Sequence, residues 1–278
     1  MWNTEREQFD QEDEPRAWLW LKSSKGPTTR AGVSEDSSRD DSTMCNRSER
    51  RGSCKLQDHT MPRLIDVSHT VEDGLITYPG LPGPVVCDFL SREASRALYA
   101  KGTEFQIGKI EMVANTGTYV DSPFHRFADG ADLAALDLER LADLDGLVID
   151  ATGRGRSLGP DLFVRRDVRG KAVLIRTGHD AHWATPAYFE GHPFLTGAAA
   201  QWLRDAGAAL VGIDSLNIDD TRDGTRPVHT CLLGAGIPIA EHLCNLAALP
   251  AEGFRFHAAP VKFRGVGTFP VRAYGVVG

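Results

Sequence analysis

Residues 115–125 read Asn115-Thr116-Gly117-Thr118-Tyr119-Val120-Asp121-Ser122-Pro123-Phe124-His125 and are the most informative part of the chain. Polar residues that can carry chemistry stand at alternate positions here, and Gly117 and Pro123 interrupt regular structure. A two-residue period places alternate side chains on one face of an extended segment. We therefore predict that four side chains project into one cavity: Asn115, Tyr119, Asp121 and His125.

Asp121 and His125 are the strongest pair in this stretch. A carboxylate can bind a metal ion or orient a histidine, and a neutral imidazole can accept a proton near physiological pH. An Asp and a His four residues apart are also common in turns and on surfaces. The spacing alone leaves the catalytic and the surface interpretation open.

Composition narrows the class of protein. The chain has 278 residues, of which 41% are hydrophobic and 25% charged, as in ordinary globular proteins. Its net charge of -7 provides no basic surface for nucleic acid or for an anionic membrane. No apolar run is long enough to span a bilayer, and no signal peptide is visible. The five cysteines form no dense framework and are expected to be free thiols, which favours a cytoplasmic protein.

The chain divides near Met61. Residues 1–60 are polar and aperiodic over most of their length, and we expect them to be a disordered tail. Residues 61–278 alternate strand and helix patterns and predict a single α/β domain. Strands are expected over 62–68, 146–151, 172–177, 210–213, 237–241 and 271–277, and helices over 132–143 and 196–206; residues 229–233 fit a helix or a strand. Thr196 is the expected N-cap of its helix and Gly207 the residue that ends it.

Two sequence motifs resemble those of the cyclase family, which includes bacterial kynurenine formamidases and isatin hydrolase. Residues 115–125 resemble its signature H-x-G-T-H-x-D-x-P-x-H, with Asn115 and Tyr119 in place of the first two histidines. Residues 229–241 resemble its second signature, in which a His (His229) precedes a Glu (Glu241) by twelve positions. The resemblance covers nearly all of residues 61–278. It implies a mixed-sheet swivelling β/β/α domain that forms a homodimer or a higher homo-oligomer.

The resemblance also implies roles for particular residues. Asp121, His229 and Glu241 become candidate ligands of a divalent metal ion, zinc or manganese, and His125 the catalytic acid or base. The Asn carboxamide and the neutral phenol are much weaker ligands than imidazole, so a single ion or a metal-free pocket is expected instead of a dinuclear site. We expect Tyr119 to donate a hydrogen bond to Asp121 or Glu241.

The leading functional interpretation is a hydrolase that opens an amide or cyclic amide in a small aromatic molecule, as an arylformamidase does. His125, Tyr119 and Asn115 form its expected catalytic set, and the partner is a small-molecule substrate. Two alternatives remain open from the sequence. One is a metal-independent cyclase or dehydratase that uses Tyr119 and His125 as acid and base, and the other is a non-catalytic small-molecule binder.

Overall fold

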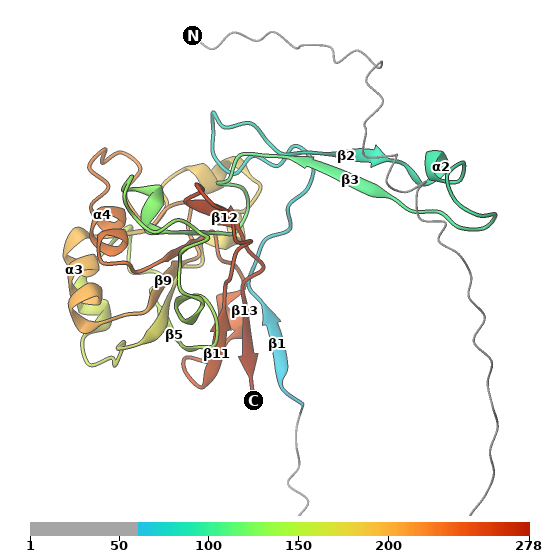
Figure 1. Ribbon diagram of the computed structural model, residues 1–278. Coiled ribbons are helices and arrows are strands. Elements are labelled where there is room, and N and C mark those ends of the chain that lie inside the picture. The colour runs from blue at the N-terminus through green and yellow to red at the C-terminus, as the bar shows by residue number, and fades with distance from the viewer. Residues whose placement is uncertain (1–60) are drawn as a thin grey trace, which may run out of the picture. The chain divides into compact units, whose positions relative to one another are not determined.

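A nine-stranded sheet forms the centre of the domain (Figure 1). The computed structural model describes residues 61–278, so the predicted disordered tail, residues 1–60, lies outside the described residues. In sheet order the strands are β1 (Arg63–Asp66), β13 (Tyr274–Val277), β11 (Phe254–His257), β5 (Leu144–Asp150), β7 (Lys171–Arg176), β9 (Leu210–Ile213), β10 (Ile239–Glu241), β4 (Tyr119–Asp121) and β12 (Thr268–Pro270).

The sheet is mixed. Its middle strands β5, β7, β9 and β10 run parallel, whereas β1, β13 and β11 on one side and β4 and β12 on the other are antiparallel to their neighbours. Parallel neighbours need crossover connections, which here carry the few helices. The predicted α/β class with a mixed sheet is confirmed.

Alternating side chains divide the core into two layers. On β7, Val173 and Ile175 pack on the side that α3 (Gly197–Ala206) and α4 (Pro227–Gly234) cover, while Ala172 and Leu174 face the opposite layer. Strands that are buried on both faces read as continuous apolar runs, which is why these strands were predictable.

Helix α3 matches its prediction at both ends. The Thr196 side chain accepts a hydrogen bond from the amide of Ala199, and Gly207 ends the helix with a left-handed backbone at φ 84°. The choice between helix and strand for residues 229–233 is resolved as helix α4. The predicted helix over 132–143 is wrong: the Asp132 carboxylate folds the chain into a turn by accepting from the amides of Ala134 and Ala135, and only the 3₁₀ turn Leu138–Arg140 follows.

Asp214 follows β9 and fastens the ends of two parallel strands. Its carboxylate accepts hydrogen bonds from the Thr177 amide at 2.7 Å, the Thr177 hydroxyl at 2.6 Å and the Gly178 amide at 3.0 Å. Burial is the largest influence on this carboxyl group and raises its pKa to about 6, against these hydrogen bonds. Asp214 therefore connects β7 to β9.

A two-stranded hairpin extends from the sheet domain (Figure 1). It pairs β2 (Val85–Leu90) with β3 (Ile107–Glu111), and α2 (Arg92–Ser95) lies in its connection. Val86 and Ile110 are paired across the hairpin, and their side chains are 44% and 62% exposed. A hairpin without a third strand is marginally stable by itself.

The remaining elements are short. A small parallel pair joins β6 (Ser157–Leu158) to β8 (Phe194–Leu195). The other 3₁₀ turns are Pro123–His125, Pro160–Phe163, His179–His182, Pro186–Phe189 and Leu246–Ala248. None of the helices in residues 61–278 has the length and apolar character needed to cross a membrane.

Candidate functional site

Strand β4 brings two residues of the first motif into the sheet. Tyr119 and Asp121 are two positions apart, so both side chains project from the same face. The extended conformation covers only these three residues. His125 reaches the site through the 3₁₀ turn Pro123–His125, and Gly117 turns the preceding chain at φ 65°. As expected, Gly117 and Pro123 interrupt regular structure on either side of β4, so the two-residue alternation holds only within the strand.

Asp121 provides a buried carboxylate oxygen that has no hydrogen-bond donor within residues 61–278. Its side chain is fully buried, and Thr268 donates a hydrogen bond to its Oδ1. Among the described residues, none donates a hydrogen bond to Oδ2. A buried anionic oxygen without a partner is costly, so it marks a position where a cation or a donor belongs.

His229 faces Asp121 from the first turn of α4. Its Nε2 lies 3.6 Å from Asp121 Oδ2 and 3.7 Å from Glu241 Oε1. On the other side of the ring, Nδ1 lies 2.6 Å from Asp219 Oδ2. The same Asp219 carboxylate accepts from the amides of Val228 and His229, at 2.7 and 3.0 Å. One carboxylate thus begins the helix and orients the imidazole.

The pKa of His229 reflects these charges. Burial by itself would lower the pKa, but the neighbouring carboxylates of Asp121, Asp219 and Glu241 outweigh burial and raise it to about 10. The three surrounding carboxylates therefore favour a positive charge at this point, which the imidazolium or a bound cation can provide.

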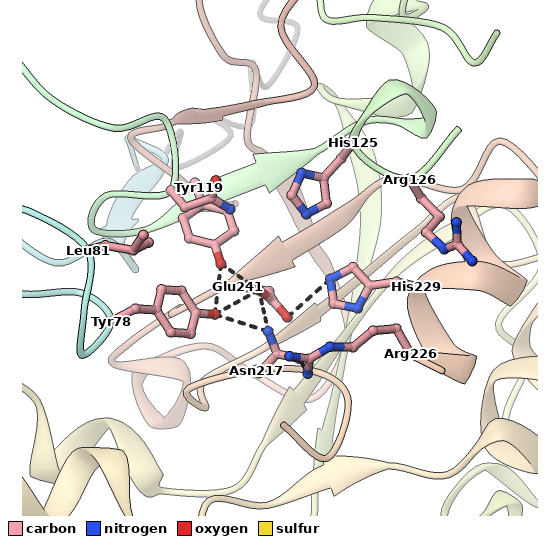
Figure 2. A pocket seen from close by; sticks show the side chains of 10 residues that line it. Tyr78, Leu81, Tyr119, His125, Arg126, Asn217, Arg226, His229 and Glu241 are labelled. Atoms are coloured by element: carbon pink, nitrogen blue, oxygen red, sulfur yellow. Dashed lines mark hydrogen bonds and ion pairs between the residues drawn. The ribbon is translucent and has the colours of Figure 1, made fainter. Parts of the chain in front are cut away.

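Glu241 lies directly across from Tyr119 in the antiparallel pair of β10 and β4. Its Oε1 accepts a hydrogen bond from the Ile218 amide at 2.6 Å. Its Oε2 accepts from the Tyr119 hydroxyl at 2.6 Å, and from Tyr78 and Asn217 at 3.3 Å each (Figure 2). The expected bond from Tyr119 to an acidic residue is confirmed, with Glu241 as the acceptor.

Tyr119 is held in its neutral form. The side chain is buried, and burial together with the charge of Glu241 raises the pKa of the phenol well above its ordinary value. A neutral phenol is a poor metal ligand, and its single proton is already donated to Glu241. Tyr119 therefore offers Glu241 a hydrogen-bond donor and offers no anionic ligand atom.

The candidate site opens into a cavity of about 310 Å³. His125 lies at its edge with a side chain that is 35% exposed, and its Nδ1 is 2.8 Å from the Thr268 hydroxyl. Ten residues line the cavity: Tyr78, Leu81, Asn115, Tyr119, His125, Arg126, Asn217, Arg226, His229 and Glu241 (Figure 2). Five of the six site residues predicted from the sequence line this space, and the sixth, Asp121, is buried next to His229.

The donor set fits a divalent cation. Asp121, His125 and His229 each offer a ligand atom, and these atoms all lie within 4.8 Å of one another. Glu241 Oε1 is adjacent through its 3.7 Å approach to His229 Nε2. Carboxylate oxygen and imidazole nitrogen are suitable ligands for zinc and manganese.

Arg226 stands where the cavity meets the start of α4. It precedes Pro227 and has a left-handed backbone, with φ 49° and ψ 60°. This conformation is strained for a residue other than glycine. Its guanidinium lines the cavity, and Nη1 approaches Asn217 Oδ1 at 3.4 Å.

Several residues of the site were not predicted as functional. Asp219, Asn217 and Arg226 lie in loops without a recognisable pattern, and Thr268 is a single hydroxyl in a short strand. His192 lies behind Asp219: it is 2% exposed, and its Nε2 contacts the carbonyl oxygen of Asp219 at 3.1 Å.

The chain belongs to the Cyclase family, whose model, described as "Putative cyclase", matches residues 65–220. Two kynurenine formamidases match this chain in sequence over most of their length. A kynurenine formamidase of Bacillus cereus is 27% identical over 216 residues, which cover 75% of this chain and 95% of the relative. A kynurenine formamidase of Salinibacter ruber is 28% identical over 219 residues, covering 76% and 95%.

Solved structures agree with this assignment. One is described as "The Structure Of Potential Metal-Dependent Hydrolase With Cyclase Activity"; it is 25% identical, has a TM-score of 0.66, and the match covers 78% of this chain and 99% of that one. Isatin hydrolase A from Ralstonia solanacearum has a TM-score of 0.68 over 78% of this chain and 92% of its own, and at 22% identity it supports the fold.

Proposed function

We propose that this protein is a hydrolase that cleaves an amide or cyclic amide bond in a small aromatic molecule. The observation that carries the proposal is the unpartnered Oδ2 of Asp121, which faces His229 Nε2 at 3.6 Å beside the cavity. Kynurenine formamidases among the relatives suggest an aryl formamide as the leading substrate. The cavity of about 310 Å³ is suited to a molecule of this size.

Asp121, His229 and Glu241 would hold a single zinc or manganese ion. A bound divalent ion would supply Lewis-acid chemistry. It would lower the pKa of water, so that hydroxide is available at neutral pH to attack a carbonyl carbon. Asp219 keeps the Nδ1 edge of His229 occupied, so that Nε2 faces Asp121 and Glu241. A carboxylate behind a metal-binding histidine is a common arrangement in such sites.

His125 is placed to move the proton. It can accept a proton from the attacking water and return it to the nitrogen of the broken C–N bond, giving a carboxylate and an amine. Tyr78 and Leu81 on the cavity wall offer an apolar surface for an aromatic ring. Asn115 also lines the cavity, where its carboxamide can hydrogen-bond the substrate.

The metal-independent cyclase or dehydratase receives less support. That reaction would require Tyr119 to give up a proton, yet burial raises the pKa of this phenol and its proton is donated to Glu241 at 2.6 Å. Tyr119 is thus better suited to hold Glu241 than to act as an acid.

The test combines metal analysis with hydrolysis assays on the purified full-length protein. We expect near-stoichiometric zinc or manganese after loading, and release of the aromatic amine from an aryl formamide or ring opening of an isatin-type amide. Asp121→Asn should lose both metal and activity, whereas His125→Ala should keep the metal and lose activity. Asp150→Asn, on the surface, is the matched control.

Two outcomes would contradict the proposal. Hydrolysis that persists at full rate in His125→Ala, or in protein freed of metal by a chelator, would exclude the assigned roles. Tight binding of the aryl formamide to the loaded protein without cleavage would identify the small-molecule binder instead.

A further inference from the structure

The hydroxyl of Thr268 lies between the side chains of Asp121 and His125, two residues of the first motif. Thr268 is on β12, where it is paired in register with Asp121 on β4, and it is 2% exposed. Its Oγ1 lies 2.8 Å from His125 Nδ1 and donates a hydrogen bond to Asp121 Oδ1. His125 Nδ1 and Asp121 Oδ1 are themselves 3.8 Å apart, which is too far for a direct hydrogen bond.

Counting protons fixes the direction of both hydrogen bonds. A threonine hydroxyl has one proton to donate and lone pairs that accept, and an ionised carboxylate only accepts. The proton of Thr268 therefore points to Asp121, and its lone pair faces His125 Nδ1. That contact is a hydrogen bond only if Nδ1 carries the ring proton. In a neutral imidazole the other nitrogen, Nε2, is then the unprotonated one.

We propose that Thr268 is a positioning residue that holds His125 in the Nδ1-protonated tautomer and leaves Nε2 as the basic atom. The proposal rests on the hydrolase function above, because it assigns the atom of His125 that moves the proton. It also assigns His125 to proton transfer and not to the metal through Nδ1, since Thr268 already occupies that nitrogen. The cation is left to Asp121, His229 and Glu241.

The backbone holds Thr268 in place before any ligand arrives. A side chain at Gly267 would put its Cβ 2.4 Å from the amide nitrogen of His125 and 2.6 Å from its Cα. Only glycine permits so close an approach between β12 and the 3₁₀ turn Pro123–His125. The carbonyl oxygen of Gly267 also accepts a hydrogen bond from the Ser122 amide at 2.7 Å. Rigid support of this kind gives a positioning hydroxyl its precision.

The experiment compares Thr268→Val with Thr268→Ser in the full-length, metal-loaded protein. Valine keeps the volume and β-branching but removes the hydroxyl, and serine keeps the hydroxyl. The first measurement is the tautomer of His125 from long-range ¹H–¹⁵N correlation spectra, with its signals assigned by their loss in His125→Gln. We expect Nδ1 protonation in the parent and in Thr268→Ser, and a shift toward Nε2 protonation or a mixture in Thr268→Val.

The second measurement is steady-state hydrolysis. We expect kcat to fall by about 10- to 100-fold in Thr268→Val with little change in KM, and to be largely restored in Thr268→Ser. An Nε2-protonated His125 in the parent would overturn the proposal, as would a Thr268→Val protein with parental tautomer and kcat. The tautomer of the parent is measurable whether or not Thr268→Val folds. It is also measurable if no substrate is hydrolysed, so failure of the hydrolase function is distinguished from failure of this inference.

Discussion

The hydroxyl of Tyr119 donates a 2.6 Å hydrogen bond to Oε2 of Glu241, directly across two antiparallel strands of the sheet. The bond occupies one oxygen of Glu241 with a neutral donor and leaves the other, Oε1, near His229. Tyr119 therefore binds the oxygen of Glu241 that is turned away from His229.

Restoring the two missing histidines should add a metal site. In Asn115→His with Tyr119→His, the hydrogen bond to Glu241 Oε2 is removed and two strong ligands are added. We expect zinc titration by calorimetry to show a second equivalent that the parent lacks. Tyr119→Phe is the matched control, because it removes the same hydrogen bond without adding a ligand, and it should only lower the free energy of unfolding, by about 1–3 kcal/mol. Identical titrations for the double variant and the parent would contradict this assignment of Tyr119.

Asp214 should make stability depend on pH between about 4 and 6. Its pKa is raised to about 6 in the folded protein, whereas an unfolded aspartate titrates near 3.8. The native state binds more protons in this window, so the free energy of unfolding should fall as pH rises, by on the order of 3 kcal/mol. Urea titrations at several pH values measure this slope.

Asp214→Asn should be less stable than the parent, because the side-chain NH₂ group that replaces Oδ2 cannot accept the hydrogen bond from the Gly178 amide. It should also lack the contribution of Asp214 to the pH dependence of the free energy of unfolding. A variant with the same pH slope as the parent would show that other groups produce it.

The left-handed backbone at Arg226 predicts that Arg226→Gly is more stable than Arg226→Ala, the reverse of the usual order for these two substitutions. Arg226→Gly removes the strain, whereas Arg226→Ala retains it, so the glycine variant should be more stable by roughly 1 kcal/mol. At Arg222, which does not have a positive φ, the order should be the usual one, with alanine the more stable. Thermal melts of the four variants test both comparisons, and an alanine variant at 226 at least as stable as glycine would rule out backbone strain there.

The exposed hairpin predicts how the chain assembles. The Val86–Ile110 pair is the kind of surface that a partner subunit covers, and we predict a homodimer or a higher homo-oligomer that buries it. Ile110→Asp should reduce the molar mass measured by light scattering to that of the monomer. Lys109→Asp, on the opposite face of β3, is the control and should leave the mass unchanged. A parent that is monomeric at all concentrations would contradict the prediction.

The sequence predicted the parts of the fold that follow from local rules. Thr196 and Gly207 bound α3 because capping depends on neighbouring residues, and β7 was predictable from its continuous apolar run. Leucines at 133, 136, 138 and 141 favoured a helix that did not form: the Asp132 carboxylate caps a single turn, and the backbone is extended at Asp137 before the 3₁₀ turn Leu138–Arg140.

The six predicted site residues were brought together, although no periodicity linked residues 121 and 229. Family motifs identified them, and their roles stay predictions. Asp219 and Thr268 were missed because their significance depends on pairing between distant segments. A lone threonine before Phe269 carries no local signal for its contact with His125.

The position of β4 in the sheet has a consequence for biosynthesis. Its two neighbours, β10 and β12, are supplied by residues 239–241 and 268–270, which follow β4 far along the chain. Asp121 leaves the ribosome long before Glu241 and Thr268 do. The growing polypeptide therefore carries an unpaired strand and an unpartnered carboxylate until both of these later segments have been synthesised, and the candidate site is completed only then.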